Sequence, residues 1–184
     1  MTELRGPRVV LRAWRDEDLD PFAALNADPA VMEFLPGPLS REASAQMIAR
    51  MRSAIDERGW GFWAVDLGGR CIGFTGITYP RFEAHFTPCV EIGWRLAREA
   101  WGHGYATEAA RLALDYGFGA LALPEIVAFT TVANRRSRRV MERLRMRCRP
   151  EDDFDHPSLP GHPLQRHVLY RLSRDEYPAR HRPE

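Results

Sequence analysis

Long hydrophobic runs are missing from the sequence, since no apolar stretch reaches the roughly 20 residues that a transmembrane helix needs. Residues 1–14 also lack the apolar segment of a secretory signal peptide. There are only 3 cysteines, an odd number without paired spacing, which argues against a disulfide framework or a zinc site. These absences together predict a cytoplasmic protein without membrane attachment or a bound metal.

An excess of charge of one sign is also missing, because the formal net charge is only +1. General attraction to nucleic acid or to an anionic membrane is therefore not expected. Eight arginines do gather between Arg135 and Arg149, but no aromatics interleave and their spacing spreads charge around a helix. A solvated helix is the simpler interpretation, and an RNA- or ribosome-associated protein stays open as an alternative.

The fingerprints of the common nucleotide-binding loops are incomplete around Gly102 and Gly104. No Lys follows these glycines as a P-loop requires, and Thr107 stands where a dinucleotide-binding loop needs its third Gly. What is present is an apolar run, a small-residue loop and an amphipathic run. A loop of this kind points backbone N–H groups outward at a positive helix N-terminus, which predicts a site for a phosphate or pyrophosphate.

The remaining sequence predicts alternating strands and helices in one domain, 1–184, without a repeat or a linker. Ser40 is suited to cap a helix to about Glu57 that Gly59 ends, and Gly68-Gly69 is suited to a hairpin turn. The predicted strands are 9–13, 62–67, 71–78, 89–96, 125–131 and 166–172, and the other predicted helices are 16–26, 105–118 and 134–144. Such alternation indicates a mixed sheet with helices on both faces.

Three segments together resemble the GNAT N-acetyltransferase superfamily, and within it the RimJ/RimL-like branch. They are Val90-Glu91-Ile92-Gly93-Trp94-Arg95-Leu96, then Trp101-Gly102-His103-Gly104-Tyr105-Ala106-Thr107-Glu108-Ala109, then Asn134-Arg135-Arg136-Ser137-Arg138-Arg139-Val140-Met141-Glu142. Two positions depart from the family pattern: Glu99 replaces Gln or Arg, and Arg145 stands where Gly usually follows the last of these helices. An Arg in a left-handed turn costs about 1–2 kcal/mol.

The resemblance implies an α/β (α+β) fold with a mixed, mainly antiparallel central sheet. It implies an enzyme that transfers an acetyl group from acetyl-CoA to a primary amine, either a small molecule or a protein N-terminus. A non-catalytic CoA-binding or regulatory module of the same fold is the alternative. The resemblance does not decide between a monomer and a homodimer.

Cofactor contacts follow from the resemblance at three places. The backbone of Trp94, Arg95 and Leu96 is expected to pair with the pantetheine amides, provided that the strand splays from its neighbour. Asn134 is expected to bond the pantetheine arm, although it could equally be an ordinary helix cap. The N–H groups expected to hold the pyrophosphate are those of Gly102, His103, Gly104, Tyr105 and Ala106.

Acetyl transfer to an amine requires a base, because a primary amine is mostly protonated at neutral pH. Glu91 is the first candidate, since strand alternation places it beside Gly93, where space for an extended ligand is expected. Glu33 is the second candidate, in a segment resembling the family's substrate side. Both could instead be structural carboxylates. Ser137 is expected near the thioester sulfur as a possible general acid, or as part of a helix cap.

The acceptor is expected to be cationic, because Glu33 and the acidic residues 152–155 lie on loops assigned to the substrate side. These loops could also face bulk solvent and have no effect on substrate choice. The cysteines lie in or beside apolar segments, which favours packed thiols over nucleophiles. Direct attack of the amine in a ternary complex is therefore expected, rather than an acyl-enzyme.

Overall fold

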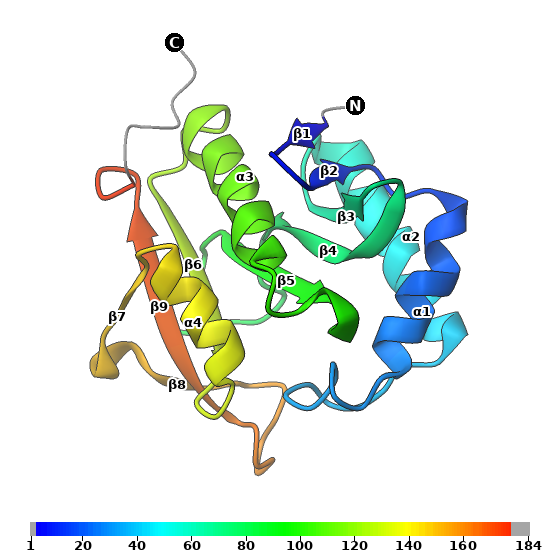
Figure 1. Ribbon diagram of the computed structural model, residues 1–184. Coiled ribbons are helices and arrows are strands. Elements are labelled where there is room, and N and C mark those ends of the chain that lie inside the picture. The colour runs from blue at the N-terminus through cyan, green and yellow to red at the C-terminus, as the bar shows by residue number, and fades with distance from the viewer. Residues whose placement is uncertain (1–2, 178–184) are drawn as a thin grey trace. The chain divides into compact units, whose positions relative to one another are not determined.

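The computed structural model describes residues 3–177, which divide into two compact units (Figure 1). The first unit comprises residues up to 77 together with 93–113, and the second comprises 78–92 together with those from 114 onward. Strand β5 (Glu91–Leu96) and helix α3 (Tyr105–Gly119) contribute residues to both. The described residues form nine strands and four α-helices with one parallel strand pair, which confirms the expected mixed, mostly antiparallel α+β fold.

The first unit is built on a succession of strands, and those before β5 are β1 (Leu4–Arg5), β2 (Val10–Arg12), β3 (Phe62–Leu67) and β4 (Arg70–Thr78). Strands β1 to β4 pair antiparallel with their neighbours in chain order, and β5 follows β4. The turn between β3 and β4 uses Gly68 and Gly69 with φ of +62° and +90°, as the sequence predicted. At Gly73 of β4 a Cβ would lie 2.0 Å from the Arg95 carbonyl oxygen, so only glycine allows β4 to approach β5 this closely.

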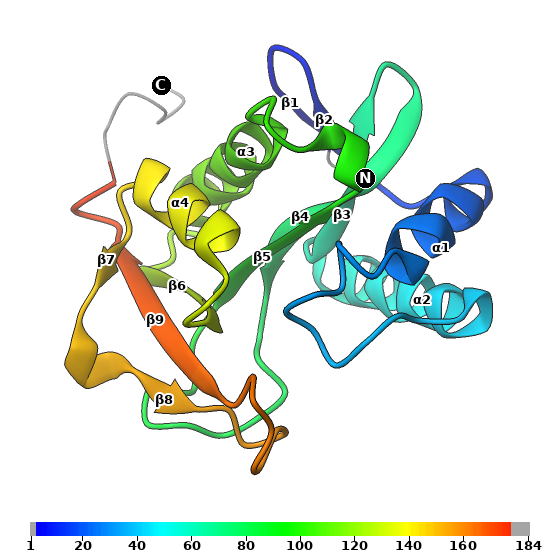
Figure 2. The same cartoon turned by 60° about the horizontal axis from the view of Figure 1, so that its bottom comes forward.

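Besides the start of α3, the helices of the first unit are α1 (Leu19–Ala27) and α2 (Arg41–Arg58). The short turn η1 (Asp16–Asp18) precedes α1, and the short turn η2 (Arg98–Ala100) follows β5. Helix α2 begins where Ser40 Oγ accepts a hydrogen bond from the N–H of Ala43, and it ends at Gly59 with φ of +80°. Helices α1 and α2 lie side by side (Figure 2). Trp63 and Phe22 are fully buried in this unit.

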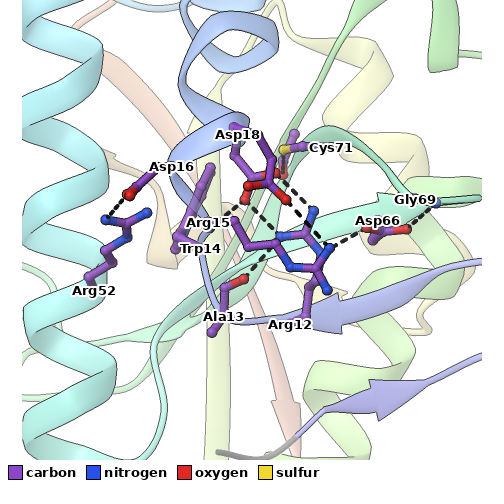
Figure 3. A network of polar contacts seen from close by, with 12 residues as sticks. Arg12, Ala13, Trp14, Arg15, Asp16, Asp18, Arg52, Asp66, Gly69 and Cys71 are labelled. Carbon is purple, nitrogen blue, oxygen red and sulfur yellow. Dashed lines mark hydrogen bonds and ion pairs between the residues drawn. The ribbon is translucent and has the colours of Figure 1, made fainter.

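A buried ion network joins β2 to η1 and β3 in the first unit (Figure 3). The guanidinium of Arg12 donates to both carboxylate oxygens of Asp18, at 2.7 and 2.8 Å, and to Asp66 at 2.7 Å. Asp18 also accepts from the backbone N–H of Arg15, and Asp66 accepts from that of Gly69. The positive charge of Arg12 is thus paired with two carboxylates inside the protein.

The second unit contains the start of β5, β6 (Glu125–Thr131) and β9 (Arg166–Ser173) in that order, with β7 (Arg147–Cys148) and β8 (Phe154–Asp155) both paired to β9. Its further helical segments are α4 (Arg135–Arg143) and η3 (Pro150–Asp152). Strand β5 pairs in parallel with β6 at Glu91 and Val127. Strand β6 pairs antiparallel with β9 along its whole length.

The register of these pairs sorts the residues of the second unit onto two faces. Since opposed residues share a face, Glu91 lies on the face that carries Val127, Phe129 and Leu169. This face carries a hydrophobic cluster as well as Arg171, which pairs with Val127, and the connection 79–88, which runs beside β8 in Figure 2, contributes aromatic rings to the cluster. Helix α4 covers the opposite face, where Asn134 and Arg138 bond to Thr130 and Tyr170.

Several predicted boundaries were wrong. The helix expected at 16–26 is interrupted, because Asp18 is bound by Arg12 and the N–H of Arg15, and the chain forms the separate turn η1 first. The strand expected from 89 begins at Glu91. The acidic residues 152–155, expected on a loop, contribute to η3 and β8, and β8 depends on pairing with β9 rather than on a local pattern. Within residues 3–177, no helix is both long and apolar enough to cross a membrane.

Candidate active site

The glycine loop of the first unit has the backbone geometry that its sequence predicted. Gly102 and Gly104 take left-handed conformations, with φ of +81° and +83°, and α3 begins at Tyr105. The first backbone hydrogen bond of the helix runs from the N–H of Glu108 to the Gly104 carbonyl. In the described part of the chain, the N–H groups of residues 102–106 have no acceptor. Five donors at a helix N-terminus form a site suited to an anion.

Arg8 adds a cation to this loop, and the sequence did not indicate it. Its guanidinium donates to the His103 carbonyl at 2.9 Å and lies 4.8 Å from the centre of the Tyr105 ring. Its Nε and backbone N–H both donate to Glu108 at 2.7 Å. Burial alone would raise the pKa of Glu108, but these hydrogen bonds outweigh burial and lower it. Glu108 therefore holds Arg8 against the glycine loop.

Three aromatic side chains contact β5 in the first unit. A Cβ on Gly93 would lie 3.2 and 3.3 Å from the Phe62 ring, so the expected open space beside Gly93 is occupied by that ring and the expectation was wrong. Trp101 donates its indole N–H to the Leu96 carbonyl at 2.9 Å, which ties the loop to the end of β5. The guanidinium of Arg95 lies 5.4 Å from the centre of the Phe74 ring.

The side chain of Arg95 runs from β5 to α1. Its Nη1 donates to Asn26 Oδ1 at 2.7 Å. Burial lowers the pKa of Arg95 to about 10, so it stays protonated at neutral pH. Glu33 lies in the turn after α1 with an exposed side chain. The first unit therefore carries the predicted pyrophosphate residues, the backbone of Trp94–Leu96 and one of the two candidate bases.

Glu91 belongs to the second unit, and its carboxyl group has no partner there. The group is half-buried on the face that carries Val127 and has no hydrogen-bond or ion-pair partner among residues 3–177. Burial, which disfavours the charged form, raises its pKa to about 7. A carboxylate with this pKa can accept a proton near neutral pH.

Asn134 caps α4, as one of the two interpretations of the sequence required. Its Oδ1 accepts from the N–H of Ser137 at 3.1 Å, and its Nδ2 donates to Thr130 Oγ1 at 3.0 Å. The hydroxyl of Ser137 has no partner in the described part of the chain. Two groups at the start of α4 therefore remain available to a ligand, the Ser137 hydroxyl and the second N–H of the Asn134 amide.

The acidic loop of the second unit is largely neutralised internally. Asp152 accepts from Arg171 at 3.1 and 3.3 Å, and Asp155 pairs with Arg166 at 3.3 Å. Two of the carboxylates expected to attract a cationic acceptor therefore already have cations beside them. The described residues also contain no group of three His, Cys, Asp or Glu side chains arranged to hold a metal ion.

The cysteine thiols are poorly suited to nucleophilic attack. Burial raises the pKa of Cys71 to about 12 and that of Cys89 to about 11. The thiolate, which is the nucleophilic form, is therefore scarce at both positions near neutral pH.

The contacts that the sequence did not reveal join residues far apart in the chain. Arg8 meets the loop 95 positions later, and Arg95 meets Asn26 over 69 positions. No periodicity or local motif relates such pairs. Glu108, at the start of α3, belongs to the glycine motif of the sequence, but nothing in that motif indicates its partner Arg8.

Comparison with known proteins gives one consistent result. The family described as "Acetyltransferase (GNAT) domain" matches residues 8–147. The uncharacterized protein YkkB of Bacillus subtilis (strain 168) is 33% identical over 150 residues, which is 79% of this chain and 85% of YkkB.

Solved structures agree with this match. An acetyltransferase from Agrobacterium tumefaciens str. C58 superposes with a TM-score of 0.76 and 29% identity, covering 94% of each chain. RimL, described as a ribosomal L7/L12 alpha-N-protein acetyltransferase in complex with coenzyme A, superposes with a TM-score of 0.76 at 14% identity. That comparison covers 95% of this chain and 99% of RimL, and at this identity it shows a shared fold.

Proposed function

Because the chain belongs to the GNAT family of acetyl-CoA-dependent N-acetyltransferases, in its RimJ/RimL-type group, we propose that it acetylates a primary amine by direct attack in a ternary complex. The acceptor is a small-molecule amine or a protein N-terminus. RimL acts on a protein N-terminus, and a 31% identical relative from Aspergillus fumigatus is an FsC-acetyl coenzyme A-N(2)-transacetylase. We also propose that the two units function together as one acetyltransferase domain.

Acetyl-CoA supplies the activated acetyl group as a thioester. The N–H groups of residues 102–106 bind its pyrophosphate, and Arg8 adds positive charge to that loop. The fit to an anion rests on five N–H donors without an acceptor and on a guanidinium held beside them. The backbone of Trp94, Arg95 and Leu96 pairs with the pantetheine amides, and the free N–H of Asn134 bonds the same arm.

Glu91 is the proposed general base. Its half-buried, unpartnered carboxylate with a pKa of about 7 accepts a proton from the acceptor ammonium, directly or through a water. The neutral amine can then attack. The Ser137 hydroxyl donates a hydrogen bond at the sulfur that leaves, which stabilises the developing negative charge there. Glu33 is the second candidate base, and its side chain is exposed, whereas that of Glu91 is half-buried.

The test of the activity is thiol release from acetyl-CoA across a panel of amines, with acetylated product identified by mass. The expected result is release that depends on both the amine and the protein. Absence of release with every amine, together with binding of CoA, would indicate the non-catalytic CoA-binding module instead.

The test of the cofactor site is a change in melting temperature. Acetyl-CoA and CoA should raise it, whereas ATP and NAD should raise it much less. Gly104→Val should weaken CoA binding about tenfold, because a branched side chain strains a left-handed residue and crowds the loop. Gly68→Val is the matched control, because Gly68 is equally left-handed but lies in a hairpin turn of the same unit. Equal stabilisation by ATP would overturn the assignment of CoA.

A further inference from the structure

Arg95 has a fixed side chain whose positive charge is not paired with a carboxylate in the described part of the chain. Its Nη1 donates to Asn26, and its guanidinium stacks over Phe74, so one edge and one face are fixed. No carboxylate among residues 3–177 pairs with it, and burial is the only influence on its lowered pKa. Its other N–H groups have no partner and are not sealed from solvent, since the side chain is only half-buried.

A chain of polar groups sets the orientation of Arg95. Asn26 accepts from Arg95 through Oδ1, which turns its Nδ2 toward Ser44 Oγ at 3.1 Å. The Ser44 hydroxyl then donates to the Ser40 carbonyl at 2.9 Å, at the start of α2. Asn26 and Ser44 are completely buried. These three hydrogen bonds fix Arg95 Nη1 at Asn26, so the guanidinium has a set orientation and its remaining donors point to a defined place.

The hydrogen-bonded series from Arg95 through Asn26 to Ser44 lies beside the segment of the first unit that is assigned to the acceptor. The carbonyl of Asn26 accepts from the N–H of Leu39, so Asn26 lies where the segment 28–40 leaves α1 and returns to α2. That segment contains Glu33, and the family resemblance assigns it to the substrate side. The cofactor loop of this unit has a different arginine, Arg8, beside it. The anion that Arg95 lacks is therefore expected from the acceptor.

We propose that Arg95 binds a carboxylate of the acceptor substrate, so that the acceptor is an amino acid or a short peptide with a free carboxylate beside its amine. A guanidinium with unpaired N–H groups forms a charge-assisted, bidentate pair with a carboxylate. A partly desolvated cation without a partner makes that pair stronger than it would be in water. This inference rests on the proposed acetyltransferase activity and identifies its substrate class.

The experiment compares matched acceptors that differ only in their carboxylate. Thiol release from acetyl-CoA is measured for a panel of amino acids and di- and tripeptides, each beside its C-terminal amide. Wild type should favour the best free carboxylate over its amide by at least about tenfold in kcat/KM. In Arg95→Met this preference should disappear, with the KM for acetyl-CoA changed less than about threefold. Arg95→Lys should keep part of the preference, since it retains charge without the planar fork.

Asn26→Asp provides a second variant that keeps Arg95 in place. It puts a carboxylate at 2.7 Å from Nη1, where Asn26 Oδ1 is now, so that the guanidinium is neutralised from inside. The preference for carboxylate acceptors should fall at least about threefold, although Arg95 itself and its exposed N–H groups are retained. Arg41→Met is the control, because Arg41 is an exposed, ion-paired arginine of the same unit. It should leave the preference unchanged.

The outcomes separate this inference from the activity on which it depends. Thiol release that is equal for carboxylates and amides would overturn the role of Arg95 and leave the acetyltransferase assignment intact. A raised KM for acetyl-CoA in Arg95→Met, with the carboxylate preference unchanged, would make the bound anion a phosphate of the cofactor and overturn the inference. The absence of release with every amine would overturn both proposals.

Discussion

Two arginines of the first unit, the buried Arg12 and the half-buried Arg95, differ in the groups that bind their guanidinium. Arg12 is bound by two carboxylates, Asp18 and Asp66, in the network of Figure 3. The hydrogen bonds that Arg12 donates to Asp18 raise the pKa of Arg12, although burial opposes them. Arg95 has one neutral partner, Asn26, and burial lowers its pKa to about 10. The first arginine completes a structure within the protein, whereas the second keeps a charge available to a ligand.

Two glutamates, Glu108 and Glu91, differ in the same way, because one has hydrogen-bond partners and the other has none in the described part of the chain. Glu108 receives hydrogen bonds from the backbone and side chain of Arg8 and from the N–H of Val9, and its pKa is lowered. Glu91 receives none among residues 3–177, and its pKa rises to about 7. Satisfied groups stabilise a fold, and unsatisfied ones of this kind are candidates for chemistry. Four variants test that division.

The largest effect is expected for Arg12→Met. The change leaves Asp18 and Asp66 buried without their cation, which should cost about 3–5 kcal/mol of unfolding free energy. Urea denaturation of the variant and of Arg41→Met, an exposed control, measures the difference. A loss below about 1 kcal/mol would mean that the network contributes little to the fold.

Glu91→Gln should lower kcat about 100-fold, because an amide cannot accept the proton of the ammonium. In wild type, Glu91 must be ionised to act, so kcat should fall as the pH decreases below the pKa of about 7. The variant should lose this acid limb. A pH profile of kcat for both proteins checks the expectation, and Glu33→Gln is measured beside them. An unchanged limb in Glu91→Gln, with a lost limb in Glu33→Gln, would assign the base to Glu33.

The same Glu91→Gln variant should be more stable than wild type at high pH. A folded pKa raised to about 7 means that stability is complete below the unfolded pKa and is lost as the pH rises through the folded value. Gln stays neutral, so the variant should gain roughly 1–2 kcal/mol at pH 8 and nothing at pH 4. Thermal or urea unfolding at the two pH values provides the measurement. A gain that does not depend on pH would refute desolvation as the cause.

The smallest effect is expected for Ser137→Ala, about fivefold in kcat, because one hydrogen bond at the leaving sulfur is lost. The cap of α4 uses the backbone N–H of Ser137, so unfolding free energy should change by less than about 0.5 kcal/mol. Asn134→Ala is the companion variant and should lose about 1 kcal/mol of stability, since it removes the capping oxygen. Loss of stability with normal turnover in Ser137→Ala would make Ser137 a purely structural residue.

The sequence predicted those parts of the fold that local chemistry determines. Ser40 and Gly59 mark the ends of α2, and Gly68-Gly69 forms the hairpin turn, because capping and left-handed glycine are properties of a few neighbouring residues. At Arg145 a local difference in the turn was expected, but Arg145 takes a left-handed conformation, with φ of +62°, as the glycine of the family pattern would. The two-residue strands were not predicted, because they exist only through pairing with β2 or β9.

The candidate site was predicted only in part, for the same reason. The glycine loop and Glu91 lie in segments with a recognisable pattern, so their positions could be expected. Arg8 beside His103 and Asn26 beside Arg95 are contacts between distant segments, and nothing in either neighbourhood indicates them. The expectation of a cationic acceptor counted acidic residues without their partners, and Arg171 and Arg166 neutralise two of them.

The most direct test of the division between satisfied and unsatisfied charges is the unfolding free energy of Arg95→Met beside that of Arg12→Met, with kcat/KM on the best carboxylate acceptor measured on the same samples. The account predicts that Arg95→Met loses less than about a third of the free energy that Arg12→Met loses, because no carboxylate is left unpaired. It also predicts at least about a tenfold loss of kcat/KM in Arg95→Met. Equal destabilisation of the two variants, with unchanged kcat/KM in Arg95→Met, would contradict it.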